Sequence, residues 1–288
     1  MMKKKQWEER FFKSLSAVAT YSIFICLGWI LFMVLREGVP ALSVDMVTKI
    51  PEAGFYFGKD GGILNAIVGS FYLAFGATFI AIIVSLPIAL FMNIHMVAQR
   101  KRLRGIRLIL DILWGIPSIV YGAFGFTLML AFGMRASLLA GTITVAFLII
   151  PIMIRAMDEV IRTVPTGLME ASFSLGSTRL ETSVLVYVRK AFPGLITAVL
   201  MSLGRGIGDA ASVLFTAGFT DYLPENIMQP VATLPLAIFF QLSSPISEVR
   251  DRAYAAAVIL TLIILLFSLA GRGISNLFNK NIRHGSNN

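Results

Sequence analysis

Long apolar runs separated by short polar segments dominate the pattern of this chain. A helix needs about 20 predominantly apolar residues to cross a bilayer, and six runs are near or above that length. The pattern therefore predicts an all-α integral membrane protein, folded as a six-helix transmembrane bundle. The predicted spans are Leu15–Leu35, Ile63–Met92, Leu108–Phe132, Leu138–Ile154, Phe192–Ala217 and Tyr254–Ala270.

The composition agrees with one membrane domain. Apolar residues make up 57% of the chain and charged residues 14%, whereas about a quarter of a soluble domain is charged. No polar stretch is long enough to build a separate soluble domain. We expect a cytoplasmic N-terminal segment at 1–14, a transmembrane domain at 15–270 with a cytoplasmic loop at 156–191, and a cytoplasmic tail at 271–288.

The cations are distributed unevenly between the two predicted sides of the membrane. Most of the 25 Lys and Arg residues precede the first span, lie in the loops near 100–107 and 155–190, or follow the last span. Because cytoplasmic loops carry an excess of cations, both termini are predicted to be cytoplasmic. The net charge of +9 therefore does not indicate nucleic-acid binding, since no polar domain presents a basic face.

The loop before the fifth predicted span carries signals for two short helices. Pro165 suits the first position of a helix and Gly176 suits the residue just past its end. Thr178 and Glu181 form a T-x-x-E capping box that starts a second helix, and Pro193–Gly194 marks the entry to the span. We call residues 165–190 the elbow. From these residues alone it is equally a connector packed on its own bundle or a surface that docks into a partner protein.

The sequence lacks the signatures of catalysis and of cofactor binding. No G-x-x-x-x-G-K-[ST] phosphate-binding loop occurs, and the histidines and the single cysteine are isolated, so no metal site is indicated. We expect no catalytic residue and no cofactor on this chain. If ATP drives its activity, the ATPase must be a separate subunit.

Two stretches inside the predicted spans contain unusual residues. Arg205 and Asp209 are four residues apart, which would place both on one helical face of the fifth span. Pro117, followed by Ser118, should break or kink the third span because proline lacks an amide donor. Charged groups and irregular backbone at membrane depth favour either a structural role in packing or a polar translocation pathway.

The elbow resembles the EAA loop of ABC importer permeases. Glu170, Ala171 and Gly176 match that pattern, and Ser172 replaces its second alanine. In the family this loop forms coupling helices that rest in a cleft of the ATPase. The resemblance implies a type I importer fold with a cytoplasmic coupling elbow.

The spans resemble the phosphate-specific permeases of the PstA type. GIPSIVYGAFG and GRGIGDAASVL, which contain Pro117 and Arg205, are similar to family motifs, with Asp209 at a family glutamate position. The resemblance implies phosphate transport across a bacterial or archaeal cytoplasmic membrane. It also implies a homologous permease in a heterodimer, two ATPase copies and an external phosphate-binding protein.

Other transport functions remain open from the sequence. Another oxyanion, such as molybdate, tungstate or sulfate, would suit the same class of permease. An ion-coupled secondary transporter is a further alternative, although internal repeats and several intramembrane acids would be expected for it.

Overall fold

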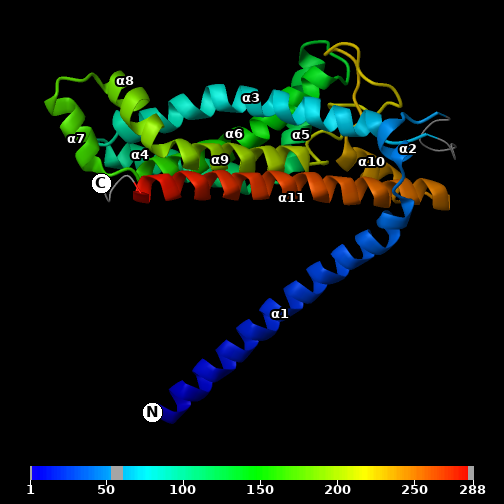
Figure 1. The fold of residues 1–288 in the computed structure, drawn as a ribbon, viewed down its shortest axis with the longest axis horizontal. Helices are drawn as coiled ribbons and strands as arrows, with labels where there is room; N and C mark the ends of the chain where they lie inside the picture. The colour runs from blue at the N-terminus through cyan, green and yellow to red at the C-terminus, as the bar shows by residue number, and fades with distance from the viewer. Residues whose placement is uncertain (1, 53–60, 285–288) are drawn as a thin grey trace.

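The computed structural model describes residues 2–52 and 61–284. Most residues in these ranges are helical, which confirms the all-α class (Figure 1). The elements are α1 (Met2–Ala41), α2 (Val44–Thr48), α3 (Leu64–Ile94), α4 (Arg100–Gly115), α5 (Ser118–Ala131), α6 (Leu138–Arg162), α7 (Thr166–Ser174), α8 (Arg179–Glu181), the π-helical η1 (Thr182–Val188), α9 (Arg189–Ile207), α10 (Leu234–Gln241) and α11 (Ser247–His284).

Five helical stretches in the described residues are long and apolar enough to cross a membrane. They are α1, α3, α6, the continuous α8–η1–α9 and α11. The third predicted span is a broken pair, in which α4 and α5 meet at an angle of 93°. Counting that pair as one span gives six, in agreement with the predicted bundle. The break falls immediately before Pro117, as its missing amide donor predicts.

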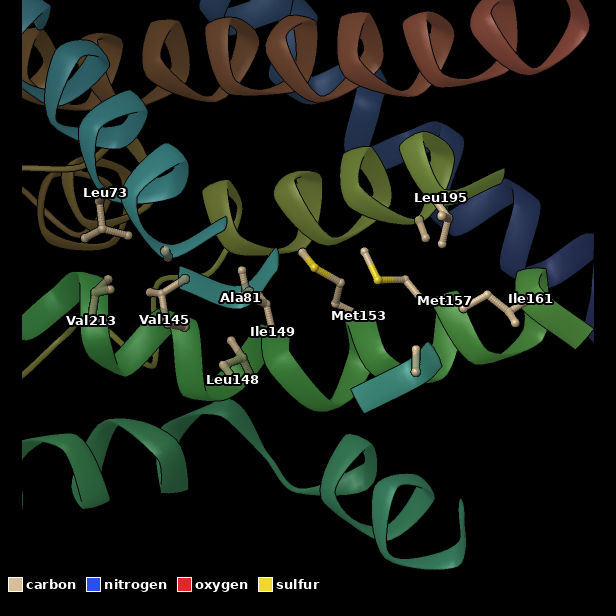
Figure 2. Close-up of a cluster of buried hydrophobic side chains, with 14 of the residues drawn as sticks. Leu73, Ala81, Val145, Leu148, Ile149, Met153, Met157, Ile161, Leu195 and Val213 are labelled. Carbon is tan, nitrogen blue, oxygen red and sulfur yellow. The ribbon is translucent and has the colours of Figure 1, made fainter. Parts of the chain in front are cut away.

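The core lies between α6, α3 and α9. Every fourth residue of α6 from 145 to 161 is almost fully buried, and Figure 2 shows these side chains in a row along the helix. The facing positions of α3, including Ala77 and Ala81, are small and also buried. Small residues let helix backbones approach closely inside a membrane, where apolar burial alone does not hold helices together. The α6 row is Val145, Ile149, Met153, Met157 and Ile161.

Helix α1 stands apart from the rest of the bundle. None of the most apolar window of its span is buried, and Figure 1 shows it diverging from α11 towards its N-terminal end. The two helices approach closely where Gly38 lies against Tyr254 and Val258, so a side chain at Gly38 would clash with backbone atoms. The start of α1, the end of α11 and helices α7 and α8 all lie towards one end of the molecule (Figure 1).

The predicted end of the fifth span was wrong. The fifth span does not run to Ala217, because α9 ends at Ile207 and an irregular segment follows. Glycines at 204, 206 and 208 weaken the helix there. Pro193–Gly194 does not interrupt the helix, which continues through both residues from the elbow. The π-helical η1 precedes the proline in this helix.

The predicted terminal segments continue membrane helices. Helix α1 begins at Met2, and α11 extends through the predicted tail to His284. The last four positions of the tail, 285–288, lie outside the described residues.

Candidate functional site: the elbow, the ionic cluster beneath it and the end of α9

The elbow has the local structure that its sequence predicts. Helix α7 ends at Ser174, and Gly176 just beyond it has φ +81°, a left-handed conformation that favours glycine. The capping box is complete, because Glu181 Oε2 accepts a 2.7 Å hydrogen bond from the Thr178 amide while Thr178 Oγ1 accepts one from the Glu181 amide. One detail differs: Pro165 is the residue before the helix rather than its first residue. These caps fix the turn between α7 and α8.

A hydroxyl pair that the sequence analysis missed ties the two arms of the elbow together. Ser172 is buried, and its Oγ lies 2.9 Å from Oγ1 of Thr182. Thr182 Oγ1 already donates to the Thr178 carbonyl, so Ser172 is the donor of the shared hydrogen bond. Serine in place of the family's second alanine therefore adds a hydrogen bond between α7 and η1. A polar residue, Ser172, beside the apolar positions of α7 was the signal in the sequence that could have indicated this hydrogen bond.

The outer surface of the elbow is open and partly apolar. Glu170, Ala171 and Gly176 are exposed. Leu175 at the end of α7 is 87% exposed, and Leu180 in α8 is 71% exposed. Leucines without covering side chains at a protruding turn are typical of a surface that another protein covers.

An ionic cluster lies where α3, α4 and α6 meet. Asp158 is completely buried and accepts two 2.8 Å hydrogen bonds from Arg107, through Nε and Nη2. Asn93 Nδ2 donates to the same carboxylate at 2.8 Å, and Arg155 Nη1 donates at 3.1 Å. Arg155 also bonds Asp111 at 2.7 Å. We call these five residues the ionic cluster.

The cluster joins three helices a short distance along the chain from the elbow. Four charge-assisted hydrogen bonds on one buried carboxylate hold the helices in a fixed arrangement. The sequence analysis missed it because the partners of Asp158 in α3 and α4 are 65 and 51 residues away. A usable signal was an acid three residues after an arginine near the end of an apolar span.

The Arg205–Asp209 pair differs from the predicted one. Asp209 lies beyond the end of α9, and its Oδ1 is 3.9 Å from Arg205 Nη2, longer than a hydrogen bond. The carboxylate is nearly buried and instead accepts a 2.8 Å hydrogen bond from the Ser212 amide through Oδ2. Arg205 keeps about half of its side chain exposed, at 54%. The two residues are therefore close, but not on one helical face.

The residues around the break at Pro117 lie near the same irregular segment. Pro117 precedes α5 and Ser118 is its first residue. One turn later Gly122 packs against the chain after α9, where a side chain would lie 2.7 Å from the Ala211 carbonyl oxygen. The structure thus brings the start of α5 and the turn that contains Asp209 into one region, while the elbow is at the other end of α9.

A family model assigns the chain to a class of membrane transport proteins. The model for binding-protein-dependent transport system inner membrane components matches residues 85–284, and the chain belongs to this family. It is a multi-pass permease subunit of an ABC importer, a transport component rather than an enzyme, and such a subunit works with an ATPase and a substrate-binding protein.

Individual relatives are more specific. The chain is 31% identical to the phosphate transport system permease protein PstA of Haemophilus influenzae, over 92% of this chain and 94% of that protein. It is 33% identical to the protein of the same name from Xylella fastidiosa strain 9a5c, over 83% of this chain and 82% of that protein. Its fold is similar to a chain of the MetNI methionine ABC transporter, solved in inward-facing conformations, with a TM-score of 0.61 at 19% identity, covering 75% of this chain and 95% of that chain.

Proposed function

We propose that this chain moves inorganic phosphate across the cytoplasmic membrane as one permease subunit of an ATP-driven importer. The observation that carries the proposal is its similarity, over 92% of its length, to a phosphate transport system permease. The complete transporter would contain a second, homologous permease, two ATPase copies and an external phosphate-binding protein. The uncovered apolar surface of α1 is suited to contact with lipid and with the second permease.

The elbow is the proposed contact with the ATPase. Its exposed leucines and the exposed positions Glu170, Ala171 and Gly176 support this role. The left-handed turn and the capping box make it a rigid shape that can insert into a groove. Because α8, η1 and α9 form one continuous helix, movement of the elbow would be transmitted directly to Arg205 near the far end of α9.

The same assignment sets the proposed orientation. Both termini would be cytoplasmic, since the start of α1 and the end of α11 lie towards the elbow end of the molecule (Figure 1). The cation-rich segments at both termini and at the start of α4 agree with this orientation.

Arg205, Asp209, Pro117 and Ser118 are the proposed elements of the translocation pathway. The exposed guanidinium of Arg205 has no hydrogen bond to Asp209, so it could pair with an oxyanion in transit. Asp209 would limit the affinity, which lets the anion leave. The broken backbone at Pro117 is the kind of irregularity that membrane proteins tolerate where it lines a cavity.

Uptake by intact cells tests the proposed function. Cells that produce the complete transporter should accumulate radiolabelled phosphate, and cells without this chain should not. Unlabelled molybdate, tungstate and sulfate should compete poorly. Strong competition by one of them would reassign the substrate to that oxyanion. Uptake that stops when the proton gradient collapses but persists without ATP would instead indicate an ion-coupled transporter.

A further inference from the structure

A basic cavity lies beside the ionic cluster, at the elbow end of the bundle. Its volume is about 440 Å³, within the range of roughly 300–1,000 Å³ that small-molecule sites occupy. Four arginines line it: Arg100, Arg104 and Arg107 from α4, and Arg162 from the end of α6. Asn93 and the hydroxyl residues Thr166 and Tyr187 also contribute to its wall.

Three of the four cavity arginines have no carboxylate partner among the described residues, whereas Arg107 is paired with Asp158. No carboxylate is among the lining residues. The side chains of three of the arginines form no hydrogen bond or ion pair with any residue that the structure describes: Arg100, Arg104 and Arg162. Asp158 is nearby, but Arg107, Arg155 and Asn93 already occupy its two oxygens. The cavity therefore has guanidinium groups in excess and no internal anion for them.

Three of the four arginines come from one helix, and one of these three is held in place by hydrogen bonds. Residues 100, 104 and 107 share one face of α4 at helical spacing, where like charges repel one another. Arg107 is held in place by Asp158 through Nε and Nη2, which leaves Nη1 outside those bonds. Guanidinium groups are suited to phosphate oxygens because their planar donors can bind them in pairs. A bound anion would reduce the electrostatic repulsion between these guanidinium groups.

We propose that this cavity binds a phosphate group, through Arg104 and Arg162 together with Arg107. The group could come from inorganic phosphate or from the headgroup of an anionic phospholipid. Apolar neighbours such as Val97 and Leu103 also line the cavity and would suit the start of an acyl chain. Since Val164 and Thr166 at the entrance to α7 form part of the wall, the ligand would join the elbow to the bundle. This site is separate from Arg205.

Binding to the permeases and the ATPase, assembled without the external phosphate-binding protein, tests the proposal. Two arms are run on full-length protein in detergent or in phosphatidylcholine nanodiscs: equilibrium binding of radiolabelled inorganic phosphate, and native mass spectrometry of phosphatidylglycerol retention. The test variant is Arg104→Gln with Arg162→Gln. The matched control is Lys101→Gln with Arg102→Gln, two cations of the same helix that do not line the cavity. Arg104 and Arg162 are exposed, so their loss leaves no buried group unpaired.

We expect the test variant to lose binding by about tenfold or more in one arm, because each lost charged hydrogen bond is worth about one order of magnitude or more. The control should bind as the unchanged protein does. Loss in the phosphate arm would identify a free-anion site, and loss in the lipid arm a headgroup site. Equal binding by test and control variants in both arms would overturn the proposal. If the double variant does not assemble, Arg162→Gln alone is measured in both arms, and its binding is compared with that of the control in the same way. Both arms measure binding rather than transport, and the test and control variants keep the same Arg205, so the difference between them reports on the cavity and not on the proposed pathway.

Discussion

Asp158→Asn is the substitution that tests the ionic cluster most sharply. The carboxylate is completely buried and accepts hydrogen bonds from Asn93, Arg107 and Arg155. Asparagine keeps the shape but removes the charge and turns one acceptor oxygen into a donor that faces donors. Removing one partner of a buried charge pair costs about 3–5 kcal/mol of stability. Because asparagine has nearly the same shape as aspartate and leaves no cavity, we expect a loss of about 3 kcal/mol for this variant. At about 2–4 °C per kcal/mol, the Tm should fall by roughly 6–12 °C.

Thermal unfolding of the purified chain in detergent measures this shift, followed by the loss of monodisperse protein on heating. Asp111→Asn is the matched control, because Asp111 bonds the same Arg155 but keeps 48% of its side chain exposed. Exposed ion pairs contribute only about 0–1 kcal/mol, so the control should lose less than about 4 °C. Equal shifts for the two variants would refute the conclusion that buried charge at Asp158 fixes the three helices.

Three further substitutions test other parts of the molecule. Arg205→Ala should lower phosphate uptake about tenfold or more while the transporter still assembles, because it removes a charged donor from the proposed pathway; uptake assays with co-purification as the control measure both. Gly176→Val should reduce recovery of the ATPase with the chain, since φ +81° costs a β-branched residue about 1–2 kcal/mol. Gly69→Ala should lower the Tm in detergent, because the added methyl group would clash with the Ala232 carbonyl oxygen and such overpacking costs about 1–3 kcal/mol. Gly204→Ala, with open space around it, is the control and should leave the Tm unchanged or raise it.

Local signals in the sequence were enough to predict several features. The capping box at Thr178 and Glu181 and the turn at Gly176 depend on residues within a few positions of one another, so the sequence contains all of the information. The break at Pro117 follows from the chemistry of one residue. The length of each apolar run predicted the spans. A membrane helix forms its backbone hydrogen bonds within itself, so this feature is also local in the sequence.

Features that depend on distant residues could not be predicted in this way. The ionic cluster pairs α6 with α3 and α4 across 44 to 65 residues, as in the bond from Arg107 to Asp158. The end of α9 at Ile207 was missed because apolar residues continue past it in a buried, irregular segment.

The contact between the elbow and an ATPase is the central claim, and site-specific cross-linking tests it most directly. A single cysteine is placed at Leu175, which is 87% exposed at the end of α7, after the exposed native Cys26 is changed to serine. We predict that a short cross-linker will join Leu175→Cys to the nucleotide-hydrolysing subunit in membranes, and that ATP will alter the yield. No adduct with such a subunit, or labelling of this cysteine by an impermeant reagent added outside intact cells, would contradict the claim.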